Sequence, residues 1–472
     1  MPILRSPTLA SLALLGLAIG AAPLARAADP TPAELNERLE ALDQQVKALT
    51  RKLEAANEQG AKPADGGAHA VASDKDGFGI VSADGNTKIK FWGYIHADGR
   101  FFFDDDQTRL TDQFLLRRAR LVMEGTLAKY WDFRIMSEFG NVAASAPAVV
   151  SLTDAYVIGN FDPSFKIEVG RFKTPIGLEF TQNDTVTMFI ERGYTSNLVP
   201  ARDEGAQVFG DLLGGRLSYN LGVFNGGVDN ANRDTDNADD KDAVARLLAT
   251  PFKGGFAPLA NLTVGIAASY GSADGVPGAG TGLPTGFITA GQNAYATYAA
   301  ATTANGRHTH VVPQLYWSWG PAEVLAEYAG SNNRISAGAA APSVNVSNRA
   351  YVVEAGYIIT GENASYKGWS PNASFSPDFS SWGGFEVVGR IEHTALDSRA
   401  IPFLTNGAAV AGVATVASQR FATGFGAGVN WLFNRNVKLM LNFEHTTFDS
   451  GVAGTGDREA ENLIESRLQL VF

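Results

Sequence analysis

The sequence predicts an all-β protein: a transmembrane antiparallel β-barrel of about 16 strands with an N-terminal coiled-coil helix. Three observations predict it. Beyond residue 77, apolar and polar residues alternate with period two in runs of about ten residues, the length that a tilted membrane strand needs. Mean hydropathy is -0.05, although 45% of the residues are hydrophobic. The chain also ends inside such a run, on the aromatic residue Phe472.

Composition excludes several classes of protein. The chain has no cysteine, which rules out a disulfide framework, a thiolate metal site and a thiol nucleophile. Its formal net charge of -11 argues against nucleic acid as a partner. Glycine supplies 51 of the 472 residues, more than the ~7% usual in proteins. In a barrel, this excess suits sites where strands curve and where the lumen must stay open.

The first 27 residues have the pattern of a secretory signal peptide. Arg5 precedes the apolar run Leu9–Ala22, and Ala25–Ala27 is a small-x-small cleavage site. The alternative is an uncleaved anchor helix, but the apolar run is short for one. We therefore expect residues 1–27 to be removed and the mature chain to be exported without a helical anchor.

Residues 28–60 carry a heptad pattern. The apolar positions recur at alternating steps of four and three residues: Leu35, Leu39, Leu42, Val46, Leu49 and Leu53. This pattern predicts a periplasmic coiled-coil segment for oligomerisation, with a single amphipathic helix lying on the domain as the alternative. Residues 61–77, rich in Gly, Ala and Asp, are expected to be a flexible linker, and 78–472 the barrel domain.

Period-two runs follow one another along the barrel domain. The clearest, in chain order, are 88–100, 130–140, 216–223, 262–269, 385–392, 437–444 and 462–472. In the penultimate run, for example, Leu439 and Leu441 alternate with Lys438 and Asn442. Each run therefore predicts a strand with one apolar and one polar face.

A soluble β-sandwich would alternate in the same way, so two further features decide between the two folds. Aromatic residues cluster at the ends of runs, as in 316–319 and 431–433, which suits the interfacial girdles of membrane barrels. Short turns such as 433–436 occur together with long polar loops such as 229–242 and 272–294, which is typical of outer-membrane barrels. A barrel of this size would enclose an aqueous lumen.

An ordered set of short motifs resembles the phosphate-selective porin O and P family of Gram-negative outer membranes. The motifs are Arg117–Leu121, Leu152–Ala155, Val169–Glu179, Glu191–Arg192, Gly205–Val208, Gly222–Gly226, Thr360–Glu362, Gly428–Trp431 and Arg467–Gln469. The resemblance covers most of 78–472. It implies a homotrimer of sixteen-stranded barrels in the cell outer membrane, each with its own pore, and its members often carry a periplasmic N-terminal coiled coil.

An anion channel needs cations on its lumen wall, because an anion must exchange its hydration for charge-assisted hydrogen bonds. Alternation places Arg118 and Arg120 on one polar face, whereas strict alternation puts Arg117 on the lipid face unless a bulge re-aims it or it snorkels to an interface. In the resembled family, the arginine pair matching Arg117–Arg118 contributes to the anion site, and the residue matching Asp154 lies near the constriction.

The stretch 174–203 breaks the alternation. A segment of this length without clear structure is usually functional, and by resemblance to general porins it is expected to fold into the barrel and narrow it. The predicted anion-binding and pore-lining residues are Arg117, Arg118, Arg120, Arg134, Asp154, Arg171, Lys173, Arg192, Arg202 and Arg390. The alternatives are that the strand arginines only brace the wall by pairing with lumen acids, and that the loop charges lie on the surface.

Two positions depart from the phosphate-specific members of the resembled family. Those members have an arginine after the glycine of the first strand, where this chain has Gly93-Tyr94, and a lysine after the Gly-Leu-Glu motif, where this chain has Phe180. The solute is therefore expected to be phosphate, polyphosphate or another small anion. A general porin with weak selectivity is the first alternative.

Other chemistry receives little support from the sequence. His308 and His310 share one strand face, but a third metal ligand is not evident, and the chain has no Gly-x-Ser-x-Gly nucleophile motif. We expect no enzyme activity, no metal and no cofactor. The expected partners are small inorganic anions, outer-membrane lipid and two further copies of the chain, without nucleic acid. A barrel whose coiled coil tethers another envelope component is the second alternative.

Overall fold

The computed structural model describes residues 67–73, 77–104, 110–140, 150–232, 239–276, 280–338, 341–405, 418–451 and 456–472. The expected signal peptide, coiled coil and first part of the linker lie outside the described residues. The described chain belongs to one unit, Gly67–Phe472. No helix within these ranges has both the length and the apolar character needed to cross a membrane.

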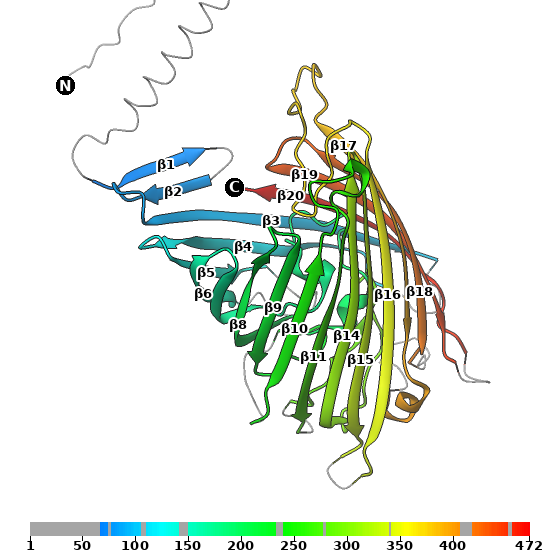
Figure 1. Ribbon diagram of the computed structural model, residues 1–472. Coiled ribbons are helices and arrows are strands. Elements are labelled where there is room, and N and C mark those ends of the chain that lie inside the picture. Colours follow the sequence, from blue (N-terminus) through cyan, green and yellow to red (C-terminus); the bar gives the residue numbers. More distant parts are fainter. Residues whose placement is uncertain are drawn as a thin grey trace, which may run out of the picture. The chain divides into compact units, whose positions relative to one another are not determined.

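Within the described residues, sixteen antiparallel strands form a closed barrel, which confirms the predicted β-barrel (Figure 1). They are β3 (Lys88–Phe103), β4 (Gln113–Leu127), β5 (Trp131–Glu138), β6 (Ser151–Asp162), β7 (Phe165–Lys173), β8 (Arg202–Leu212), β9 (Leu217–Phe224), β10 (Asp242–Ala249), β11 (Thr263–Asp274), β14 (Thr303–Trp319), β15 (Ala322–Ser336), β16 (Val344–Ile358), β17 (Gly384–Ala395), β18 (Phe421–Leu432), β19 (Val437–Asp449) and β20 (Glu461–Val471). Consecutive strands pair with one another, and β20 pairs with β3 to close the sheet.

The period-two pattern sorts the side chains between the two faces of the barrel wall. On β3, Phe91 and Ile95 are exposed on the outer face, whereas Tyr94, His96 and Asp98 are buried on the inner face. The terminal residue takes part in the same wall, because the Phe472 amide donates to the Gly93 carbonyl at 2.9 Å. The outer face is therefore apolar and the inner face polar, as a lipid-embedded barrel requires.

A β-bulge interrupts β4 at Arg117. In the pairing with β3, His96 is opposite Arg118 and Ala97 is opposite Leu116, so Arg117 has no register partner on β3. The bulge shifts the alternation by one residue, and both Arg117 and Arg118 are buried on the inner face. Of the two alternatives that the sequence left open for Arg117, the structure therefore has the bulge.

Connections differ in length at the two ends of the barrel. One end, here called the short-turn end, has the connections 128–130, 163–164, 213–216, 250–262, 320–321 and 433–436, with 359–383 as its one long segment. The opposite, long-loop end has 174–201, 225–241, 275–302 and 396–420 among its connections. The loop 275–302 contains a separate two-stranded sheet, β12 (Phe287–Ile288) and β13 (Ala294–Ala296).

The region expected to be a linker contains regular structure. β1 (His69–Ser73) pairs with β2 (Gly77–Val81), and β2 pairs with the start of β3 at Lys88–Phe91. This part of β3 therefore has strand neighbours on both sides, β2 and β4. The remaining elements are short helices: α2 (Leu178–Thr181), η1 (Tyr194–Leu198), η2 (Ala257–Leu259) and η3 (Ser398–Phe403).

Candidate functional site

The segment 174–201, called the constriction loop below, folds into the barrel, as the sequence predicts. Its backbone is held by inner-face side chains of distant strands: Tyr194 N donates to Glu392 at 2.8 Å, and Ile190 N donates to Asn442 at 2.9 Å. Asn430 donates to the Met188 carbonyl at 2.9 Å. The loop therefore fills the lumen on the side of β15 to β20, and the two cavities described next lie on the other side.

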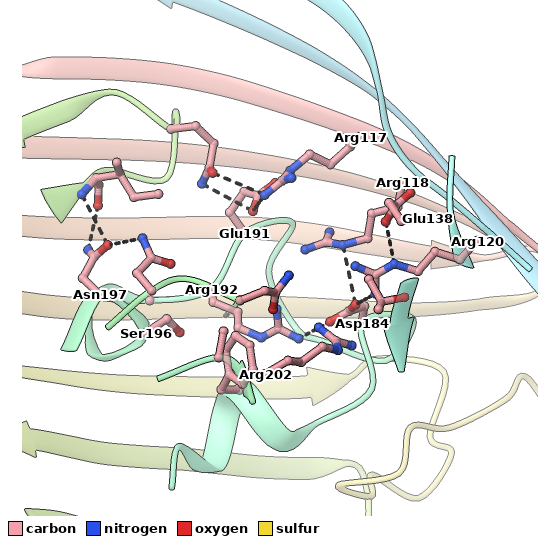
Figure 2. Close-up of a pocket in the computed structure, with 18 of the residues that line it drawn as sticks. Arg117, Arg118, Arg120, Glu138, Asp184, Glu191, Arg192, Ser196, Asn197 and Arg202 are labelled. Carbon is pink, nitrogen blue, oxygen red and sulfur yellow. Dashed lines mark hydrogen bonds and ion pairs between the residues drawn. The ribbon is translucent and has the colours of Figure 1, made fainter. Parts of the chain in front are cut away.

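Asp184 is the centre of one group of charges in the constriction loop. Arg118 Nε lies 3.5 Å from its carboxylate, and Arg120 and Arg192 are in closer contact with it (Figure 2). Lys173 Nζ lies 3.6 Å from the same carboxylate. Burial alone would raise the pKa of Asp184, but Arg192 and the other cations outweigh it and hold that pKa well below its usual range. The carboxylate therefore stays ionised and fixes four cations around the loop.

Glu191 is the centre of a second group. Arg117 Nε lies 2.6 Å from it, Arg100 3.0 Å and Arg467 3.4 Å. Burial would raise the pKa of Glu191, but Arg117 and its neighbours lower it well below the usual value. Gln292, near the tip of the β12–β13 hairpin, also contacts this pair, with its amide oxygen 3.3 Å from Arg117. The second group therefore joins the constriction loop to both the barrel wall and the loop 275–302.

The first cavity, the long-loop cavity, has a volume of about 170 Å³. Five arginines and three carboxylates line it: Arg117, Arg118, Arg120, Arg192, Arg202, Glu138, Asp184 and Glu191. The uncharged lining consists mainly of amide and hydroxyl side chains, several of which come from the long loops (Figure 2). Formal positive charge therefore exceeds negative charge around this cavity.

The second cavity, the short-turn cavity, has a volume of about 320 Å³. It too is lined by five cations and three carboxylates: Arg120, Arg134, Lys173, Arg202, Arg246, Asp154, Glu168 and Asp184. Arg120, Asp184 and Arg202 line both cavities. Cationic side chains thus continue from one cavity to the other past the constriction loop.

Most of the predicted pore-lining residues lie at these cavities. Arg117, Arg118, Arg120, Arg192 and Arg202 line the long-loop cavity, and Arg134, Asp154 and Lys173 line the short-turn cavity. Several of these residues also form ion pairs with carboxylates of the lumen, as expected if they brace the barrel wall. Arg202 lies 2.5 Å from Asp154, and Arg120 lies 2.5 Å from Glu138.

Two predicted residues line neither cavity. Arg171 lies 3.6 Å from Glu204. The next residue of β7, Phe172, lines the short-turn cavity, so alternation directs the Arg171 side chain to the opposite face of the strand. Arg390 has a fully buried side chain under the constriction loop, where it contacts Glu444 at 2.8 Å and donates to the Glu191 carbonyl at 2.8 Å. Alternation assigns Arg390 to the inner face, but the loop covers that part of the wall.

Arg246 on β10 is a cavity residue that the sequence analysis missed. It donates to Gln314 at 2.9 Å and to Thr181 at 3.2 Å, and among the described residues it forms no ion pair. Asp242 and Val244 share its face of β10. That alternation is the signal that could have found it, but apolar neighbours on both faces obscure the pattern.

The two positions that depart from the resembled family lie at the centre of the site. The Tyr94 hydroxyl accepts a hydrogen bond from Arg120 at 2.6 Å and donates to Asp184 at 3.1 Å. Lys173 and Arg192 lie over the Phe180 ring, 5.4 and 4.8 Å from its centroid. Aromatic residues therefore contact the cations where the resembled members carry further cations.

The two histidines pair with aspartates. His308 Nε2 lies 2.8 Å from Asp242, and His310 Nε2 lies 2.7 Å from Asp229. Within the described ranges, no group of three or more metal-ligating side chains could hold a metal ion.

Comparisons with known proteins support this picture. The family model described as phosphate-selective porin O and P matches residues 89–472. No curated protein matches the chain. Among solved structures, the outer membrane channel DcaP of Acinetobacter baumannii is 10% identical with a TM-score of 0.52, and the match covers 82% of this chain and 98% of that one. This likeness shows a common barrel fold.

Two further structures match with lower scores. The anion-selective porin from Comamonas acidovorans is 10% identical, with a TM-score of 0.49 and coverage of 82% of this chain and 100% of that one. The trimer form of OmpT from Vibrio cholerae is also 10% identical, with a TM-score of 0.49 and coverage of 82% and 99%.

Proposed function

This chain belongs to the phosphate-selective porin O and P family, and we propose that it passes small anions passively. Membership of this family indicates a channel of the Gram-negative outer membrane rather than an enzyme. Phosphate and polyphosphate are the solutes proposed first. The anions would move along the arginine and lysine side chains that line the two cavities.

One observation carries this proposal: cations outnumber carboxylates in both cavities, and Arg120 and Arg202 line both. An anion crossing the constriction would therefore meet a cation before it leaves the previous one. Arginine suits this role because its planar guanidinium forms bidentate contacts with oxyanions. Partial neutralisation by Asp184 and Glu138 also fits, because an anion that is bound too tightly would stop the flux.

The same neutralisation favours the second candidate, a general porin with weak selectivity. Arg117 and Arg120 each lie within 2.6 Å of a carboxylate. If their charges act only as wall braces, the excess of cations would produce a slight anion preference and no binding.

Planar-bilayer recordings separate the candidates. In a KCl gradient, we expect a reversal potential with the sign of chloride preference, and millimolar phosphate should reduce the chloride current. Chloride preference without phosphate block would indicate the general porin. Potassium preference, or the absence of conductance, would reject the proposal.

We also propose that three copies associate and that residues 28–60 form a coiled coil in the periplasm. Unheated gel electrophoresis of the full chain should give a trimer, and deletion of 28–60 should weaken it. A deletion that leaves the trimer intact but releases a co-purifying envelope component would instead support the tethering function.

A further inference from the structure

The two cavities carry the same formal charge but differ in their uncharged lining. The long-loop cavity is lined by amide and hydroxyl groups and by the aromatic ring of Phe180. Four aromatic rings line the short-turn cavity: Tyr94, Tyr156, Phe172 and Phe209. A permeating inorganic anion gains nothing from these rings, so the difference indicates a solute with an apolar part.

The aromatic residues of the short-turn cavity lie beside its cations. Tyr156 on β6 is the register partner of Arg134 on β5, and its ring centroid lies 6.1 Å from that of Phe172 in an edge-to-face arrangement. Tyr156 and Phe209 are half-buried, so part of each ring faces the cavity. The cavity therefore presents an apolar surface next to guanidinium groups.

Two of these cations have hydrogen-bonding capacity left over. Arg246 donates hydrogen bonds to the neutral side chains of Gln314 and Thr181, and it forms no ion pair within the described ranges. In the described part of the chain, Arg134 forms only long ion pairs, at 3.4 Å with Glu124 and 3.5 Å with Asp154, and its side chain is 21% exposed. A ligand carboxylate in the cavity would therefore bind the terminal nitrogens of its guanidinium.

We propose that the short-turn cavity is a subsite for organic anions that combine one carboxylate with an aromatic ring. The carboxylate would lie at Arg246 and Arg134, and the ring against Tyr156 and Phe209. The cavity volume of about 320 Å³ falls at the lower end of the ~300–1,000 Å³ range of small-molecule sites. This inference rests on the proposed anion channel and names a substrate class for it.

The test compares benzoate with acetate, which carries the same charge without the ring. In bilayers with chloride on one side and either carboxylate on the other, benzoate should bind in the channel and reduce the chloride current at concentrations where acetate does not. Equal effects of benzoate and acetate would overturn the inference even if the KCl gradient shows chloride preference. Potassium preference in the same gradient would reject the channel proposal itself.

Variants assign the effect to the cavity. The double variant Tyr156→Ala/Phe209→Ala should reduce the ratio of benzoate to acetate block about fivefold, the size of one or two aromatic contacts. Phe256→Ala is the matched control, because this exposed phenylalanine lies in the connection 250–262 and lines neither cavity; it should leave the ratio unchanged. If the double variant does not fold, Tyr156→Leu alone serves, and an unchanged ratio there would also overturn the inference.

Discussion

Arg117 and Arg118 are adjacent in the sequence, yet both side chains point into the barrel and bind different carboxylates of one loop. Arg117 lies 2.6 Å from Glu191, and Arg118 lies 3.5 Å from Asp184. The bulge in β4 makes this possible, because it places two consecutive residues on the same face. One strand thereby holds the constriction loop at two points.

Arg118 lies 3.5 Å from its carboxylate partner, whereas Arg117 lies 2.6 Å from its own, so the charge of Arg118 is the more available to a permeating anion. The Coulomb attraction between a unit charge and an anion about 6 Å away in water is about 0.7 kcal/mol. Arg118→Ala should therefore lower the chloride-to-potassium permeability ratio by about threefold, measured as a smaller reversal potential in a KCl gradient. Arg399→Ala, which removes an exposed arginine of η3, is the control. An unchanged ratio in Arg118→Ala would remove this residue from the anion path.

Glu191→Gln should loosen the constriction loop. The substitution leaves the buried side chains of Arg117, Arg100 and Arg467 without one of their carboxylates. Breaking a buried ion pair costs about 3–5 kcal/mol, so we expect a lower temperature for the heat-induced mobility shift on gels and a noisier single-channel current.

Glu204→Gln is the control for that experiment. Its side chain is 36% exposed, against 4% for Glu191, and its carboxylate lies 3.6 Å from Arg171. Because this pair is long and partly open to solvent, its loss should cost less, about 1 kcal/mol. Equal effects of the two substitutions would show that the Glu191 group does not hold the loop.

The constriction loop should tolerate acid better than alkali. A carboxylate whose pKa is lowered on folding, such as that of Asp184 or Glu191, contributes stability that is lost only as pH falls through its folded pKa, and both values lie well below the usual range. Burial and the neighbouring Glu354 raise the pKa of Glu179 well above its usual value, so its ionisation costs stability as pH rises.

We therefore expect single-channel currents that are steady at mildly acid pH and flicker more as the pH rises toward alkaline values. Glu179→Gln, which cannot ionise, should abolish the alkaline flicker while retaining an acceptor for the Gly193 amide. Flicker that increases toward acid in the parent protein would contradict this assignment.

Gln292 should limit access to the long-loop cavity. It has a positive φ of 64°, a conformation that glycine adopts without strain, and its amide contacts Arg117 and Glu191. Gln292→Gly should relieve about 1 kcal/mol of backbone strain and increase single-channel conductance by removing a cavity-lining side chain. Gln292→Asn, which tolerates the same φ and keeps a shorter amide, should give an intermediate conductance. Identical conductance in all three proteins would place Gln292 outside the path.

Much of the candidate site could be predicted because lumen-facing positions follow from strand alternation. Arg118 and Arg120 are examples, and the bulge at Arg117 was one of two alternatives. Arg390 and Arg246 show the limit of this reasoning. Both lie on inner faces, but the constriction loop covers Arg390, whereas Arg246 lines a cavity. Alternation is a property of each strand and carries no information on what covers it.

The sequence by itself determined the barrel, the inner and outer faces of its strands and the presence of a long segment without strand alternation, because each depends on the order of polar and apolar residues along a short segment. That this segment folds into the barrel was implied only by resemblance to general porins. Only the tertiary structure decided which charges meet. Arg120 and Asp184 are separated by 64 residues, and Arg117 and Glu191 by 74. They come together because closing the sheet fixes the wall and the loop then packs against β15 to β20, which leaves the cations of β4 to β10 around the cavities.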